Sequence, residues 1–220
     1  MSKYIKGYMG DQIGKLGPAV GRRWKGKSVM SAYQKYVHNP RTAEQLTVRA
    51  RFARLVELSK AMRWVLPLGM GAHAKTLGMT ESNVFMKKNW AQVTALTADD
   101  VTVNYSGLQL SSGELPEATF GQVDYGTASH LHIEATLTGG EDQAGADATD
   151  DVYLFAYCPE LKQGCLGSAA KRTAAKVSVN VPASWDGMEV QLYGFAVGGR
   201  KGFNKGMPSA TAYCGSGEVA

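Results

Sequence analysis

One segment near the N-terminus has the residue spacing of a phosphate-binding loop. Residues 21–28 read Gly-Arg-Arg-Trp-Lys-Gly-Lys-Ser, which matches the pattern Gly-x-x-x-x-Gly-Lys-Ser letter by letter. Such a loop wraps its backbone amides around phosphates only when it joins a buried strand to a helix. The preceding residues, 14–20, make a poor buried strand, and bulky side chains fill the middle of the motif. The sequence therefore favours a cationic β-hairpin tip over a nucleotide site.

The same segment surrounds an aromatic residue with cations. The candidate set is Arg22, Arg23, Trp24, Lys25 and Lys27, extended along the chain by Arg41, Arg49 and Arg51. Cations beside an aromatic ring suit docking on an acidic protein face, with Trp24 as the buried anchor. They equally suit phosphate contact with base stacking. We expect this set to bind a partner, either protein or nucleic acid.

Charge is divided unevenly along the chain. Residues 1–90 hold 17 Lys and Arg against 4 Asp and Glu, a net charge of +13. Residues 91–220 hold 7 against 15, a net charge of −8, so the whole chain carries +5. A basic arm of this kind attracts nucleic acid, an anionic membrane surface or an acidic protein face, including the acidic half of another copy.

The elements that must position these residues begin with a glycine-rich arm. Residues 1–20 contain four glycines and little periodicity, which is typical of an extended segment that orders against a partner. Lys25-Gly26 is a turn signal between mixed apolar and basic residues. It predicts a β-hairpin within residues 15–37, with a helix after the turn as the alternative.

Two helices are predicted next. Thr42 and Gln45 form a capping box, and apolar residues then recur at near-helical spacing, so we expect an amphipathic helix over 42–65 that is stopped by Pro67 and Gly69. A shorter helix is predicted from Glu81 to Trp90, capped by Thr80.

After residue 100 the apolar period changes to two. Strands are predicted at 101–105, 108–112, 130–138, 151–158, 176–181, 188–197 and 210–214, with turn residues between them. Short alternating strands without intervening helices indicate an antiparallel sandwich or barrel. One alternate set of strand 151–158 is expected to line its core. The set is either Val152, Leu154 and Ala156, or Tyr153, Phe155 and Tyr157.

Other residue groups have weaker chemical meaning. His130 and His132 alternate in one strand, which is half of a metal site with no third ligand placed by the sequence. The acidic residues of 141–151 lack a calcium-loop pattern. Cys158, Cys165 and Cys214 are too few for a disulfide framework. Free thiols are expected, and a Cys158–Cys165 bridge that leaves Cys214 over is the alternative. The sequence thus predicts a protein that is not an enzyme and uses no metal or cofactor.

Several segments resemble a known protein family. They are residues 16–30, 39–52, 151–167 and 174–197, and they cover nearly the whole chain in a specific order. The chain is similar to an uncharacterised "domain of unknown function" family of gut bacteria. That resemblance implies a basic Gly-rich N-terminal segment, a helical stretch and a C-terminal immunoglobulin-like sandwich, and it implies no activity. Separately, residues 39–52 (NPRTAEQLTVRARF) resemble a helix start in phage-encoded proteins.

These observations combine into one set of expectations. The fold class is mainly β with an N-terminal α-helical or extended segment. The domains are a basic arm and hairpin (1–37), a helical segment (38–95) and an antiparallel immunoglobulin-like β-sandwich (96–220). No stretch is long and apolar enough to cross a bilayer, and no secretory signal is visible.

The expected function is structural. We predict a non-enzymatic assembly protein of a virion, such as a bacteriophage, or of another large particle. Its arm would dock on other copies or other structural proteins and form a homo-oligomer, in the virion or the bacterial cytoplasm. A nucleic-acid-binding protein and a surface adhesion module are the alternatives.

Overall fold

The computed structural model of the chain describes residues 3–4, 12–36, 39–126, 132–138, 145–199 and 205–219. Contacts divide the chain into two compact units, Met1–Thr42 and Ala43–Ala220. Each unit is built from its own elements, and each is described by itself below.

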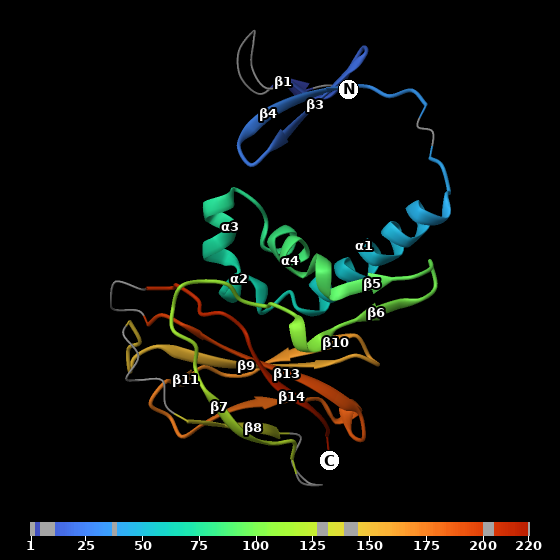
Figure 1. Ribbon diagram of the computed structural model, residues 1–220. Helices are drawn as coiled ribbons and strands as arrows, with labels where there is room; N and C mark the ends of the chain where they lie inside the picture. The colour runs from blue at the N-terminus through green and yellow to red at the C-terminus, as the bar shows by residue number, and fades with distance from the viewer. Residues whose placement is uncertain are drawn as a thin grey trace. The chain divides into compact units, whose positions relative to one another are not determined.

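The N-terminal unit is a small antiparallel sheet (Figure 1). Its strands lie side by side in chain order, and they are β1 (Lys3–Tyr4), β2 (Gln12–Leu16), β3 (Ala19–Trp24) and β4 (Lys27–Ala32). Lys25 and Gly26 connect β3 to β4 with φ values of 45° and 78°. Two positive φ angles in a two-residue loop define a type I′ turn, whose twist matches that of the strands. The predicted hairpin is confirmed, and the alternative of a helix after the turn is wrong.

The C-terminal unit begins with a layer of helices. They are α1 (Ala43–Ala61), α2 (Leu66–Gly69), α3 (Gly71–Leu77) and α4 (Glu81–Asn89), followed by the 3-10 turn η1 (Trp90–Gln92). The first predicted helix ends at Ala61, four residues before its expected end. Pro67 lies in the first turn of α2, where its missing N–H leaves no bond unmade. The second predicted helix is confirmed, since Thr80 accepts a hydrogen bond from the Asn83 amide at 3.3 Å.

Two larger antiparallel sheets and a small hairpin follow. The first sheet has the order β10-β9-β13-β14 with β11 also paired to β9, and the second has the order β12-β8-β7. The strands of the first are β9 (Asp151–Cys158), β10 (Gln163–Leu166), β11 (Ala170–Lys171), β13 (Glu189–Val197) and β14 (Ala212–Glu218). Those of the second are β7 (Phe120–Asp124), β8 (His132–Leu137) and β12 (Lys176–Asn180), and β5 (Val93–Ala95) pairs with β6 (Val101–Val103). The expectation of a mainly β protein with antiparallel sheets and an N-terminal helical part is confirmed.

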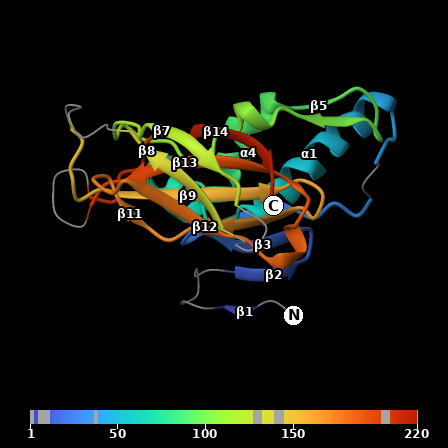
Figure 2. The ribbon, with the colours of Figure 1, turned by 90° about the horizontal axis from the view of Figure 1, so that it is seen from below.

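Strand β9 is buried on both of its faces, which makes the C-terminal unit three-layered (Figures 1 and 2). Leu154 and Ala156 pack in one apolar cluster with residues of β8 and β12. Phe155 and Tyr157 face the other way and pack with the buried residues of α1, α2 and α4. Both alternate sets expected for this strand therefore line a core, because helices cover one face of the sheet and the second sheet covers the other.

The strand expected at 108–112 does not form. The amides of Leu110 and Ser111 each donate a hydrogen bond to the Thr211 hydroxyl at 2.8 Å instead of pairing with a strand. Gly69 lies so close that a Cβ there would be 2.4 Å from the Leu110 carbonyl oxygen. Asn89 holds the same segment, since its carboxamide accepts from the Gln109 amide and donates to the Gln109 carbonyl. The segment is thus an irregular connection held by two side chains, and its apolar alternation misled the prediction.

None of the helices in the described part of the chain combines the length and apolar character needed to span a membrane.

Candidate partner-binding surface

The hairpin of β3 and β4 gathers part of the predicted cationic set on one face. Arg22 pairs with Val29 and Trp24 pairs with Lys27 across the two strands. Opposed residues of antiparallel strands share a face, and side chains alternate along each strand. Arg22, Trp24 and Lys27 therefore lie on the same side of the sheet, and Trp24 is 53% exposed. We call this set the Trp24 face.

The opposite side of the sheet carries a second exposed group. Arg23 pairs with Ser28, and Met30 pairs with Gly21, so these residues point away from the Trp24 face. Met30 is 60% exposed and Leu16 on β2 is 40% exposed. Sequence reasoning missed both apolar residues. Side chains alternate between the two faces along residues 27–32, and this alternation could have predicted that Met30 lies on the face opposite Val29.

The residues of the phosphate-loop motif have a different structural role, because they form two strands of the hairpin. Arg22 and Arg23 lie in strand β3, and Lys27 and Ser28 begin strand β4 rather than a helix. Gly21 is buried, and a Cβ at this position would lie 2.1 Å from the Gln12 carbonyl oxygen. The glycine is thus required by the close approach of β2 and β3. No amide cradle for phosphate is built by these described residues.

The sheet has little core of its own. Among residues 12–36 the structure describes Gly21 as buried and Ile13, Val20 and Val29 as half-buried. Five large apolar or aromatic side chains are exposed: Leu16, Trp24, Met30, Tyr33 and Tyr36. Small sheets are independently stable only with a packed apolar face or a covering element. Local contacts do support the end of the hairpin. The Lys15 ammonium lies 3.8 Å from the Tyr33 ring centroid, and the Tyr33 amide donates to the Pro18 carbonyl.

Three further predicted residues lie outside the hairpin. Arg41 is exposed and belongs to the N-terminal unit, whereas Arg49 and Arg51 belong to α1 of the other unit. Arg51 is engaged internally, because its guanidinium lies 4.3 Å from the Trp90 ring centroid and donates to the Trp90 carbonyl. That contact joins α1 to η1.

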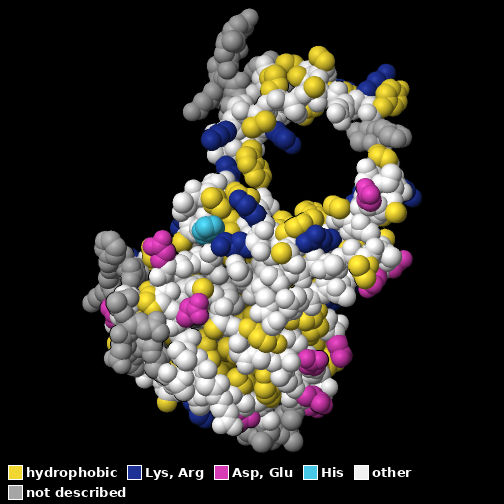
Figure 3. All heavy atoms as spheres, viewed as in Figure 1, with side chains coloured by type: hydrophobic (Ala, Val, Ile, Leu, Met, Phe, Trp, Pro, Cys, Tyr) yellow, Lys and Arg dark blue, Asp and Glu magenta, His cyan; other side chains and the backbone are white. Residues whose placement is uncertain are grey.

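The electrostatic character of the N-terminal unit is uniformly positive. Residues 1–42 contain nine Lys and Arg and one acid, Asp11, which lies outside the described residues. On the face shown in Figure 3, Asp and Glu side chains gather over the C-terminal unit. Residues 43–90 of the C-terminal unit add a further net charge of +5, so the change from basic to acidic sequence falls inside the C-terminal unit and not at the boundary between the units.

Comparison with known proteins places the chain in a family. A family model matches residues 10–205, which include the N-terminal sheet from β2 onward, the helices and most strands of the C-terminal unit. The chain belongs to DUF6266, a family of unknown function. No curated protein and no solved structure matches it. The expected resemblance to an uncharacterised family is confirmed at this level, and it brings no activity.

The remaining sequence candidates have local structural partners. His132 contacts Asn180 at 2.6 Å and Glu134 at 3.1 Å, and His130 lies outside the described residues. In the acidic segment, Asp151 pairs with Lys171 at 2.5 Å, and Glu141 and Asp142 lie outside the described residues.

The structure also describes the three cysteines and the side chains that could bind a metal ion. The three cysteines are free thiols. Partial burial raises the pKa of Cys165, and deeper burial raises that of Cys214 to about 12. Within the described ranges, no group of three His, Cys, Asp or Glu side chains is arranged to hold a metal ion.

Proposed function

We propose that this protein is a non-enzymatic assembly protein whose basic N-terminal sheet docks on a neighbouring subunit of a large particle. The observation that carries the proposal is the Trp24 face, where Arg22 and Lys27 flank a half-exposed tryptophan on a sheet with little core. A cation-flanked tryptophan is a typical anchor in a protein interface.

Charge supports a second copy as the partner. The N-terminal unit carries a net charge of +8, and residues 91–220 carry −8. Contact between unlike surfaces of two copies is heterologous, and such contacts close into rings or extend into lattices. A virion or bacteriophage component, as the local resemblance at 39–52 suggests, would use contacts of this kind.

The strand orders support an immunoglobulin-like arrangement for the body of the protein. The chain changes sheets between β8 and β9, between β11 and β12, and between β12 and β13, as in Greek-key sandwiches. One sheet has the order β7-β8-β12 and the other the order β14-β13-β9-β10. In this proposal the C-terminal unit is the scaffold, and the N-terminal sheet makes the contacts between subunits.

Nucleic acid is the second candidate partner. The same Trp24 face offers cations for phosphates and an exposed ring for base stacking. The two proposals differ in their response to salt, because phosphate contacts release counterions and the affinity then falls steeply with salt concentration.

The test compares two sets of substitutions in the full chain. In the first variant, Arg22, Arg23, Lys25 and Lys27 are changed to Gln. In the matched control, four cations of the C-terminal unit are changed to Gln: Lys75, Lys87, Lys88 and Lys205. Both variants lose four positive charges. The mass in solution is measured by sedimentation, and binding to single- and double-stranded DNA is measured over a range of salt concentrations.

The assembly proposal expects the wild type and the control to form oligomers and the hairpin variant to dissociate to monomers. Trp24→Ala should dissociate the oligomer as well, because a buried interface tryptophan typically contributes 2 kcal/mol or more, about a thirtyfold change in affinity. A monomeric wild type that binds DNA with a steep salt dependence, lost only in the hairpin variant, would establish the nucleic-acid role instead.

A further inference from the structure

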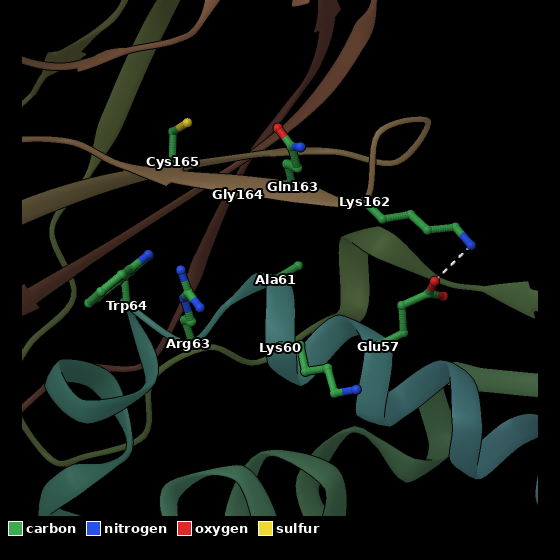
Figure 4. Close-up of a pocket in the computed structure, with 9 residues that line it drawn as sticks. All are labelled: Glu57, Lys60, Ala61, Arg63, Trp64, Lys162, Gln163, Gly164 and Cys165. Carbon is green, nitrogen blue, oxygen red and sulfur yellow. Dashed lines mark ion pairs between the residues drawn. The ribbon is translucent and has the colours of Figure 1, made fainter.

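A second surface lies entirely within the C-terminal unit, where the end of α1 approaches the edge strand β10. It is a pocket of about 510 Å³, a size common for small-molecule sites. Its side-chain walls are Lys60, Arg63 and Trp64 on the helical side and Lys162 and Gln163 beside the sheet. Figure 4 shows Arg63 and Trp64 pointing from the helical layer toward β10.

The pocket is cationic. Its one carboxylate, Glu57, is already neutralised by Arg54 and by Lys162, whose ammonium lies 2.7 Å away. Neither Lys60 nor Arg63 takes part in any of the ion pairs found among the described residues. An anion that enters the pocket could therefore bind two cations, Lys60 and Arg63, that form no ion pair with an acidic side chain of the described chain.

The pocket also presents an aromatic plane. Trp64 is 61% exposed, and the Arg63 guanidinium lies 4.6 Å from its ring centroid. A guanidinium stacked on a ring keeps its N–H donors in its own plane, where they can bind a carboxylate or phosphate with two parallel hydrogen bonds. The arrangement combines a surface for ring stacking with adjacent donors for an anionic group.

Strand β10 supplies a backbone wall. Gly167 donates its amide to the Leu154 carbonyl of β9 at 2.8 Å. Ladder bonds alternate along an antiparallel strand, so Gly164 directs its N–H and C=O away from β9. A Cβ at Gly164 would lie 2.8 Å from the Ala61 carbonyl oxygen, so only glycine permits this approach of strand and helix. One of the residues that line the pocket thus has a peptide group that is not paired with β9.

The geometry points to this pocket as a binding site for a small anionic ligand with a planar ring, such as an aromatic carboxylate or a nucleotide. The ring stacks on Trp64, and the carboxylate or phosphate binds Arg63 and Lys60. This site is separate from the Trp24 face and does not depend on the proposed assembly role.

The test titrates isotope-labelled full-length protein while the amide and indole N–H signals are followed by NMR. The probes are AMP and 2-naphthoate, which each join a ring to an anion, and adenosine and inorganic phosphate, which each carry one half of that chemistry. An acidic decapeptide is the fifth probe. We expect AMP or 2-naphthoate to shift the signals of the Trp64 indole and the Gly164 amide together. Tighter binding of AMP would indicate that the pocket prefers a phosphate, and tighter binding of 2-naphthoate would indicate that it prefers a carboxylate.

Variants then assign the contacts. Arg63→Met, Lys60→Gln and Trp64→Leu should each weaken the better ligand about tenfold, the usual cost of one charge-assisted bond or stacking contact. Lys75→Gln and Phe52→Leu, which remove an exposed cation and an exposed aromatic ring elsewhere in the C-terminal unit, should leave its affinity unchanged. All five positions are exposed, so the dispersion of the NMR spectrum should be retained.

The proposal is overturned if neither ring-bearing anion moves these two signals at millimolar concentration. It is equally overturned if adenosine or phosphate alone binds as tightly as the joined ligand, or if only the acidic peptide binds. In that last case the edge of β10 takes an extended chain.

Discussion

Arg172 and Asp150 form an ion pair that is almost completely shielded from solvent. Their side chains are 1% and 2% exposed, and the Arg172 Nε lies 3.4 Å from the Asp150 carboxylate. The guanidinium also donates to the carbonyls of Pro116 and Glu117, and the carboxylate accepts from the Gly199 amide. One buried pair therefore ties residues 116–117 and Gly199 to the start of β9 and the end of β11.

Removing one partner of this pair should destabilise the C-terminal unit strongly. Arg172→Met leaves a buried carboxylate without its counterion, a change that typically costs about 3–5 kcal/mol. For a unit of this size the melting temperature should fall by roughly 10 °C. Calorimetry measures the change.

The neighbouring pair is a matched control for that experiment. Lys171 and Asp151 are also paired, but the lysine side chain is 55% exposed. Lys171→Met should cost less than about 1 kcal/mol, since exposed pairs contribute little. Equal melting temperatures for the two variants would contradict the role assigned to Arg172.

Gly21→Ala should loosen the N-terminal sheet without affecting the C-terminal unit. The added Cβ would lie 2.1 Å from the Gln12 carbonyl oxygen, so β2 and β3 must separate. We expect a local cost of about 1–3 kcal/mol. Hydrogen exchange of residues 12–24 should then accelerate by about tenfold or more. Ser28→Ala, at an exposed position of the same hairpin, is the control and should change nothing.

Arg51 is expected to act on stability rather than on partner binding. Arg51→Met removes both its stacking on Trp90 and its hydrogen bond to the Trp90 carbonyl, at a cost of about 1–3 kcal/mol. Arg51→Lys should restore little of this, because an ammonium lacks the planar stacking surface. The two variants are compared by urea unfolding and by mass. Unchanged stability with a changed mass would instead place Arg51 in the interface.

Glu57 should make stability depend on pH in the acid range. Partial burial acts to raise its pKa, but hydrogen bonds from Lys162 and Arg54 outweigh this and hold the pKa below its ordinary value of 4.5. The ionised form is thus favoured by folding. Its contribution is present above the ordinary pKa and is lost as the pH falls through the lowered native value.

Two variants check this dependence. Glu57→Gln should be less stable than the wild type near neutral pH, and the difference should shrink in acid as the wild-type carboxyl is protonated. Lys162→Met should raise the pKa of Glu57 in a carbon-13 NMR titration. A Glu57 pKa at or above 4.5 in the wild type would contradict the account.

Local signals in the sequence predicted those elements whose structure is decided locally. Lys25-Gly26 specifies its own turn type, and Thr80 caps α4 through a contact three residues away. Strand β9 was found because its residues are apolar in both alternate sets. Strand β9 is buried on both faces because the helices cover one of them, and the sequence of the strand alone does not predict that cover.

Elements decided by distant contacts were missed. Residues 108–112 alternate like a strand, but the amides of Leu110 and Ser111 donate to Thr211, about a hundred residues away, and the Gln109 amide donates to Asn89. Strand β10 contains Gly164, and its pairing depends on β9 and on the end of α1. The candidate site was predicted in part for the same reason. The cations around Trp24 could be predicted because they are its neighbours in the sequence. Arg63 and Trp64 are about a hundred residues from Lys162, and only folding brings them to the same pocket.

The most direct test of the central claim is the mass in solution of the full chain and of a shortened chain containing residues 43–220. The shortened chain keeps the buried apolar core, so it should fold. The account predicts an oligomeric full chain and a folded, monomeric shortened chain. Identical assembly states for the two chains would contradict it, because the N-terminal sheet would then contribute nothing to contact between subunits.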